Sequence, residues 1–206
     1  MVVCEMTTYT LLSSLALLLL VLCSCSQSSA ADAAPWKQAL LDDCGSGSTL
    51  SSIGTEWYSS LDAESGGKSS LETSFADGLL KASGSIKPGW PWMGPGRAGL
   101  VLPLGDKNQA FDVSAWTGLR LRIKASGPGL LLRLHSSDIR NGDYFAVDIP
   151  ASTDFVSYDF PFQRMGQVMS AQKDWQGKQA FGIEFVAWSF RKAEYAWELD
   201  SIEFYK

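Results

Sequence analysis

The stretch FDVSAWTGLRLRIKASGPGLLLRLH, residues 111–135, decides the fold class. Over residues 119–124, leucine and isoleucine alternate with arginine and lysine, and over residues 130–135 alternate leucines share one face. A period of two is typical of strands with one face on a core and the other in water. The intervening ASGPG, residues 125–129, contains glycine and proline, which favour chain reversal. We therefore expect a hairpin, and a β-sheet protein.

Short alternating runs continue through the rest of the domain, and the turn signals ADG at 76–78 and NGD at 141–143 separate some of them. In the last run, the apolar positions change parity between Leu199 and Ile202, which predicts a β-bulge at Asp200 and Ser201. The sequence predicts an all-β jelly-roll β-sandwich with about nine to eleven antiparallel strands. Besides the central pair, the expected strands cover residues 71–75, 79–85, 98–104, 144–149, 155–162, 180–188 and 195–205.

Residues 1–25 have the pattern of a signal peptide rather than of a folded element. Residues 11–22 are apolar or small, which is long enough for a signal-peptide core and short for a membrane span. The sequence Leu22-Cys23-Ser24-Cys25 follows and resembles a lipobox, with Cys25 as the candidate for lipidation. Two alternatives stay open: cleavage after small residues near Ala30 or Ala33, and an uncleaved anchor.

Each of these alternatives places the domain outside the cytosol, as a secreted or extracytoplasmic protein. Residues 26–36 are expected to form a polar tether, and residues 37–206 the β-sandwich. A lipid on Cys25 would make the protein a membrane-anchored lipoprotein.

Charge and cysteine content exclude several function classes. The net charge is −5 and the basic residues are scattered along the sequence, so no nucleic-acid partner is expected. Cys44 is the only cysteine of the domain, which leaves no internal disulfide and favours a buried, structural thiol. No motif requires a cofactor.

Catalytic patterns are equally sparse. His135 is the only histidine, and it has no nucleophile motif beside it. Glu184 and Glu198 are a candidate carboxylate pair for glycoside hydrolysis, although two carboxylates on one sheet are more often a solvated face. We expect a protein without enzymatic activity, with a glycoside hydrolase as the open alternative.

Aromatic residues supply the main functional signal, since they make up 12% of the chain and include eight tryptophans. An aromatic plane stacks on the apolar C–H face of a sugar ring, while Arg, Asp and His hydrogen-bond its hydroxyl groups. Trp116 and Trp197 are expected in the core, and part of the remaining aromatic residues with them. The candidate ligand-binding residues are Trp57, Tyr58, Trp90, Trp92, Arg133, His135, Tyr144, Asp148 and Trp188.

A second candidate site rests on aspartates. Asp42 and Asp43 lie near the start of the domain and Asp200 near its end, so they would meet if the terminal strands pair. Carboxylate oxygens suit a hard cation, so a structural Ca²⁺ bound by Asp43 and Asp200 is one interpretation. The other is that both aspartates are solvated or accept hydrogen bonds from backbone N–H groups.

Several short motifs resemble those of a known family. LLDDC at residues 40–44 resembles the LDDF start of family-11 carbohydrate-binding modules. It is also similar to the start of the related NADH:ubiquinone oxidoreductase intermediate-associated protein family, which has a galactose-binding-like β-sandwich. The further matches, in chain order, are Trp57 with Asp62 and GGKS at 66–69, DVSAWTGL at 112–119, FPF at 160–162 and ELDSI at 198–202.

The resemblance covers residues 40–206 and implies a galactose-binding-like fold with one of two functions. The first is polysaccharide or oligosaccharide recognition, in which Trp92 and Trp188 stack on sugar rings and Arg133, His135 and Asp148 bind hydroxyl groups. The groove tyrosines of those modules correspond here to Trp57 or Tyr58, Trp92 and Trp188. The alternative is an assembly factor that uses the same face for a protein partner in the envelope.

Overall fold

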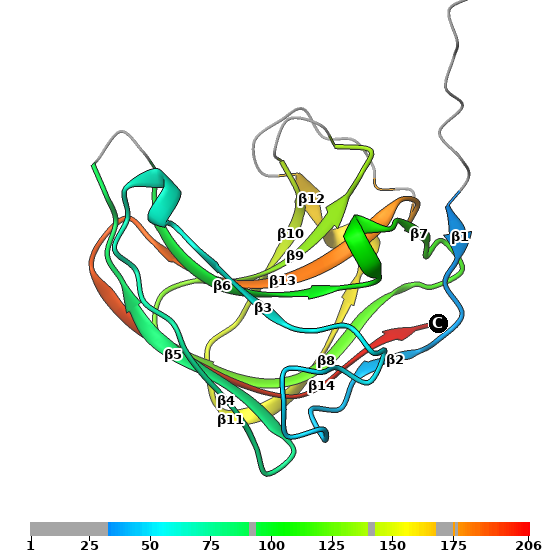
Figure 1. Cartoon of the computed structure of the whole chain (residues 1–206), viewed down its shortest axis with the longest axis horizontal. Coiled ribbons are helices and arrows are strands. Elements are labelled where there is room, and N and C mark those ends of the chain that lie inside the picture. Colours follow the sequence, from blue (N-terminus) through cyan, green and yellow to red (C-terminus); the bar gives the residue numbers. More distant parts are fainter. Residues whose placement is uncertain (1–32, 91–93, 140–142, 168–174, 176) are drawn as a thin grey trace, which may run out of the picture. The chain divides into compact units, whose positions relative to one another are not determined.

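Two β-sheets face each other in the part of the chain that the computed structural model describes, residues 33–90, 94–139, 143–167, 175 and 177–206 (Figure 1). Those residues belong to one unit, Ala33–Lys206. The expected signal peptide, the candidate Cys25, the ring of Trp92 and most of the 141–143 turn lie outside them. Among the described residues, no helix is long and apolar enough to cross a membrane.

The first sheet, called sheet A here, contains six strands side by side and two short strands at one end. Its pairing is antiparallel, except that β1 runs parallel to β7. In spatial order, the six strands are β3 (Tyr58–Leu61), β6 (Gly96–Pro103), β13 (Ala180–Ser189), β9 (Leu130–Ser136), β10 (Phe145–Ile149) and β12 (Gly166–Gln167); β7 (Phe111–Asp112) pairs with the start of β13 and with β1 (Ala34–Pro35).

The second sheet, called sheet B, is antiparallel throughout its described pairs. In the described parts of the chain, three short 3₁₀ segments lie between strands: η1 (Ala63–Ser65), η3 (Asp106–Asn108) and η4 (Phe162–Arg164). In spatial order, the strands of sheet B are β11 (Ser152–Pro161), β8 (Gly118–Ser126), β14 (Ala193–Tyr205), β5 (Leu79–Ile86) and β4 (Glu72–Ala76), with β2 (Leu40–Asp42) beside the later part of β14. The all-β sandwich predicted from the sequence is confirmed.

The prediction that residues 111–135 form a hairpin is wrong. Both strands exist, but β8 pairs with β11 and β14 in sheet B, whereas β9 pairs with β10 and β13 in sheet A. The ASGPG turn therefore carries the chain from one sheet to the other across the core. Alternation shows that a strand has one buried face, and it contains no information about which neighbour supplies the hydrogen bonds. The predicted reversal is correct, and the expected pairing partner is not.

The alternation itself predicted the burial correctly. The leucines and isoleucine of β8 and alternate leucines of β9 lie in the core between the sheets. There, Phe185 of β13 stacks on Trp197 of β14 with ring centroids 5.3 Å apart. Trp116 packs at the edge of this core against Phe204, as expected.

On the outer face of sheet B, cations and carboxylates form cross-strand pairs. Arg120 contacts Asp159 at 2.7 Å, and Lys124 contacts Glu198 at 3.0 Å. The predicted bulge in the last strand is confirmed, since the register of β14 against β8 shifts between Leu199 and Ser201. The cationic face of β8 is therefore neutralised by its own neighbours.

The folded unit begins at Ala33, before the expected boundary at Lys37. β1 pairs with β7, and the ring of Trp36 packs edge-on against Phe111 with centroids 4.9 Å apart. Part of the expected tether is therefore folded onto the domain, because Trp36 buries apolar surface there.

The motif residues at the start of the domain form a structural clasp. Asp42, which is 1% exposed, accepts hydrogen bonds from Trp57 Nε1 at 2.6 Å and from the backbone N–H of Cys44 at 3.0 Å. Cys44 is buried as expected, and burial, followed by the charge of Asp42, raises the pKa of its thiol to about 12. This clasp ties β2 to the segment before β3.

Trp57→Phe is expected to lower the free energy of unfolding by about 2–3 kcal/mol, because it removes a donor from a buried carboxylate. The matched control is Trp116→Phe, which removes the same atoms at a half-buried position where Trp116 Nε1 donates to the carbonyl oxygen of Trp36 at 3.2 Å. Urea unfolding of both variants measures the difference. Equal losses would contradict the assigned role of the Asp42–Trp57 bond.

Candidate functional site

The outer face of sheet A brings together most of the residues predicted to bind a ligand. Cross-strand pairing aligns Tyr58 of β3, Val101 of β6, Glu184 of β13 and Arg133 of β9 in one row. Side chains at every second position share this face, because successive side chains of a strand point to opposite sides. The predicted residues that it carries are Tyr58, Arg133, His135, Tyr144, Asp148 and Trp188.

Glu184 is the centre of this face. Its side chain is buried, and its Oε2 lies 3.1 Å from His135 Nε2 and 3.4 Å from Arg133 NH1. Burial by itself would raise the pKa of Glu184. The hydrogen bond from His135 and the charge of Arg133 outweigh it, so the pKa lies below the ordinary value. The carboxylate is therefore ionised at neutral pH and orients both basic side chains.

The aromatic neighbours complete the polar row. The Arg133 guanidinium lies over the Tyr144 ring, 4.0 Å from its centroid. Tyr58 is 52% exposed, and burial together with the Glu184 charge raises the pKa of its hydroxyl group. A ligand on this face would meet two phenol rings on either side of a buried ion pair.

Trp188 occupies the end of the same face, in register with Arg97 of β6. Its indole lies against Gly129, where an added Cβ would approach Trp188 Nε1 to 2.9 Å. Phe190 follows in the chain and packs edge-on against Trp188, with centroids 5.9 Å apart. A glycine beneath the indole thus lets the ring lie close to the backbone.

Two glycines, Gly99 and Gly182, leave positions of this face without a side chain. A Cβ on Gly99 would meet the Phe185 carbonyl oxygen at 2.6 Å, so the packing of the sheet itself requires glycine there. A Cβ on Gly182, beside His135, would meet nothing closer than 3.6 Å. Gly182 is buried, and Val101 Cγ1 and His135 Cδ2 lie 3.8 and 3.9 Å from where its Cβ would be, so the neighbouring side chains close over the backbone there.

Other predicted residues lie elsewhere. Trp57 is 3% exposed and belongs to the core, so its assignment to ligand binding is wrong; its indole is held inward by Asp42. Trp90 is 63% exposed in the segment between β5 and β6, beyond the end of the outer face. The expected carboxylate pair does not form, because Glu184 lies on sheet A and Glu198 on sheet B.

The two aspartates of the calcium hypothesis have other partners. β2 pairs with β14 as that hypothesis requires. However, Asp43 Oδ1 accepts from the backbone N–H of Gly45 at 3.0 Å, and Asp200 Oδ1 contacts Arg122 NH1 at 2.9 Å. No cluster of three or more His, Cys, Asp or Glu side chains suited to a metal occurs among the described residues. An aspartate paired with arginine fits a calcium site poorly, so the geometry favours the structural interpretation.

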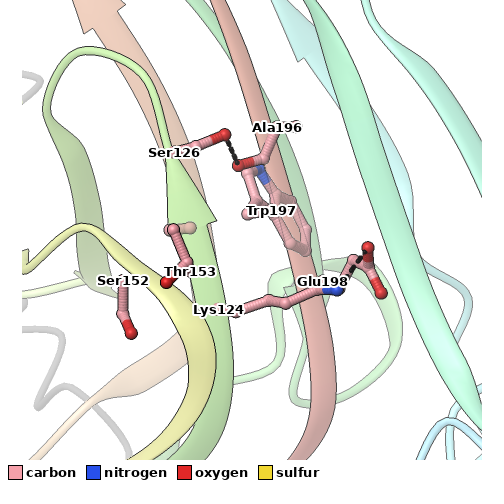
Figure 2. A pocket seen from close by; sticks show the side chains of 8 residues that line it. Lys124, Ser126, Ser152, Thr153, Ala196, Trp197 and Glu198 are labelled. Atoms are coloured by element: carbon pink, nitrogen blue, oxygen red, sulfur yellow. Dashed lines mark hydrogen bonds and ion pairs between the residues drawn. The ribbon is translucent and has the colours of Figure 1, made fainter.

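A separate hollow of about 260 Å³ lies on the outer face of sheet B (Figure 2). Lys124 and Glu198 pair with each other at its rim, and Ser126 Oγ donates to the Ala196 carbonyl oxygen at 3.3 Å. Its main charged groups are thus already paired. The outer face of sheet A offers the richer set of ligand-binding groups.

Sequence reasoning missed Glu184 as the organising residue of the site. In residues 180–188, Glu184 is the charged position opposite to the apolar Ile183 and Phe185, which is a visible signal. Only the register shows that Arg133 and His135 lie beside it.

No protein-family model matches the sequence, and no curated protein sequence matches it. Several solved structures resemble the fold, among them two of family 11 carbohydrate-binding modules. One is the family 11 carbohydrate-binding module of the cellulosomal cellulase Lic26A-Cel5E of Clostridium thermocellum, with a TM-score of 0.53 and 18% identity; 82% of this chain and 94% of that chain are covered. The chain shares the fold of this module.

The second structure is the family 11 module from Clostridium thermocellum in complex with a β-1,3-1,4-mixed-linked tetrasaccharide. It has a TM-score of 0.52 and 17% identity, covering 82% of this chain and 95% of that chain. A family 29 carbohydrate-binding module aligns with a TM-score of 0.46. At identities this low, the alignments with the two family 11 modules show the fold alone. The function has to be argued from the site.

Proposed function

We propose that this protein binds polysaccharide without catalysis, through the outer face of sheet A. The observation that carries the proposal is the convergence of Tyr58, Arg133, His135 and Trp188, distant in sequence, on one face around Glu184. Flat rings beside oriented hydrogen-bonding side chains suit a sugar chain, which presents apolar ring faces and hydroxyl groups. The mixed-linked tetrasaccharide bound by the module of similar fold supports this choice.

The two carboxylates considered for glycoside hydrolysis do not form a pair. Its buried carboxylate, Glu184, contacts Arg133 and His135, and the second candidate, Glu198, pairs with Lys124 on the other sheet. A hydrolase places two carboxyl groups on opposite sides of one glycosidic bond. We therefore propose a binding role. We also propose that the protein is extracytoplasmic and anchored through Cys25. No contact on the described surface favours the assembly-factor alternative.

Affinity electrophoresis tests the proposed function. Wild-type protein is run in gels that contain mixed-linkage β-glucan, other neutral glucans, mannan, polygalacturonate or a sulfated polysaccharide, beside Tyr58→Ala/Trp188→Ala and the control Tyr205→Ala. Tyr205 is a half-buried aromatic residue on the outer face of sheet B, where it contacts Arg120. We expect at least one polysaccharide to retard the wild type and the control, and the double variant to migrate as in a plain gel. Retardation of the double variant to the wild-type extent would remove this face from the proposal.

A further inference from the structure

One end of the sandwich carries exposed aromatic side chains. Phe190, in the turn between β13 and β14, is 68% exposed, and Trp90, in the segment after β5, is 63% exposed. The two segments are neighbours, because Ala193 pairs with Ile86 and Ser189 with Gly96. Figure 1 shows this turn at the left, at the opposite end of the unit from β1 and the C-terminus. We call this region the aromatic end.

Five cations lie in the segments that carry or adjoin these two aromatic residues. Lys68 and Lys87 lie side by side, since the N–H of Lys68 donates to the carbonyl oxygen of Lys87 at 2.9 Å. Arg191 and Lys192 follow Phe190 in the turn and are exposed, and Arg97 is the cross-strand neighbour of Trp188. Basic residues that are scattered along the sequence thus gather at one end of the fold.

These five cations differ from those of sheet B. Arg120, Arg122 and Lys124 each contact a carboxylate at 3.0 Å or less. Within the described part of the chain, none of the five cations at the aromatic end forms an ion pair. A protein with a net charge of −5 therefore has a locally unneutralised positive region.

Three neighbouring carboxylates offset part, but not all, of the charge of the five cations. Asp62 is 2% exposed, and it accepts hydrogen bonds from Ser69 Oγ and from the backbone N–H of Arg97. Glu64 of η1 and Glu194 of β14 are the exposed acidic residues beside the five cations. Asp148 belongs to the outer face of sheet A, two strands away from β13.

The aromatic end is continuous with the outer face of sheet A. Trp188 and Arg97 form the last cross-strand pair but one of β13 and β6, and Phe190 packs on Trp188 just beyond it. A sugar chain lying across Trp188 would extend toward Phe190 and Arg97, the neighbours of that ring. Acidic groups on that chain would lie near Arg97 and Arg191. Guanidinium groups form charge-assisted hydrogen bonds with such anionic groups.

We propose that the polysaccharide is anionic and that the aromatic end binds its acidic groups. This inference rests on the proposed function. The outer face of sheet A binds the sugar rings, and the aromatic end binds the acidic groups that the sugars carry. A lone cationic surface would also attract anionic membranes or nucleic acid. Its continuity with Trp188 favours a glycan.

The test is a set of titrations by isothermal calorimetry on the whole domain, residues 33–206. The ligands are oligogalacturonate, which carries carboxylates, a sulfated oligosaccharide, and a neutral mixed-linkage glucan oligosaccharide of the same length. We expect one of the anionic ligands to bind more tightly than the neutral one, with an affinity that falls steeply as salt rises. The carboxylate and sulfate arms identify the acidic group.

Two triple variants separate the aromatic end from net charge. Lys87→Gln/Arg191→Gln/Lys192→Gln removes three cations from the aromatic end. Lys37→Gln/Arg164→Gln/Lys206→Gln removes three exposed cations near the opposite end of β14. We expect the first variant to lose about tenfold in anionic affinity and most of its salt dependence, with neutral binding unchanged. The second variant is expected to bind like the wild type.

Several results overturn the inference. Equal losses in the two triple variants would show that net charge, not the aromatic end, sets the affinity. Tight neutral binding with no preference for anions would leave the proposed function intact and refute only the anionic ligand. Binding to phosphatidylglycerol vesicles or single-stranded DNA, but to none of the oligosaccharides, would refute both.

Discussion

Trp188→Ala is expected to lower polysaccharide affinity about 30- to 150-fold, which corresponds to a loss of about 2–3 kcal/mol for an aromatic side chain that stacks on a sugar ring. The indole is the ring at the end of the outer face of sheet A, supported from below by Gly129. Its removal takes away the stacking surface while the buried Glu184 pairs remain. Calorimetric titration with the polysaccharide that retards the wild type measures the effect.

A second variant tests whether the position of this ring matters. Gly129→Ala places a Cβ 2.9 Å from Trp188 Nε1, which is closer than real Cβ contacts, so the indole has to shift. Gly129 is exposed and has an ordinary backbone conformation, so we expect the fold to tolerate alanine there. Binding should weaken in Gly129→Ala with little change in the urea midpoint. Wild-type affinity in both variants would show that Trp188 does not contact the ligand.

Glu184→Ala is expected to lower the free energy of unfolding by about 3–5 kcal/mol, because it leaves the largely buried Arg133 without its carboxylate. The control is Glu198→Ala, which removes a half-buried carboxylate paired with Lys124 on sheet B, with an expected loss below about 1 kcal/mol. Urea unfolding at neutral pH compares them. Similar losses in both variants would contradict a central role for Glu184.

The pH dependence of stability gives the same residue a second test. The pKa of Glu184 is lower in the folded protein than the ordinary value of 4.5. Its ionisation therefore stabilises the fold above pH 4.5, and this contribution is lost as the pH falls through the folded pKa. The stability difference between the wild type and Glu184→Gln should shrink as the pH is lowered from 4.5 to about 3. A difference that grows in this range would mean that the carboxyl group is stabilised in its protonated form.

The family-like motifs are structural in this chain. Asp42 and Trp57 bind each other, and Asp62 accepts from Ser69 and from the backbone of Arg97. Asp112, from the third motif, caps the backbone N–H of Ser114 at 2.9 Å. These residues hold loops against the sheets, which explains why short motifs predicted the fold well and the ligand-binding residues less well.

Individual residues show where prediction from the sequence was limited. Arg133, His135 and Trp188 were predicted from their residue types, and the register places them on one face. Trp57 has the same chemistry as Trp188, but its indole is buried beside Phe185 and donates to Asp42. Residue type therefore indicates what a side chain can bind, whereas burial depends on its neighbours.

Local information in the sequence determined the strands, the chain reversal at residues 125–129, the bulge near Asp200 and the buried faces of β8 and β9. Each depends on alternation or turn chemistry within a few residues. Only the tertiary structure decided that β8 and β9 belong to different sheets, that Glu184 meets Arg133 and His135, and that distant cations lie in the segments near Phe190. Strand partners are chosen by long-range hydrogen bonding and packing, for which a period of two contains no information.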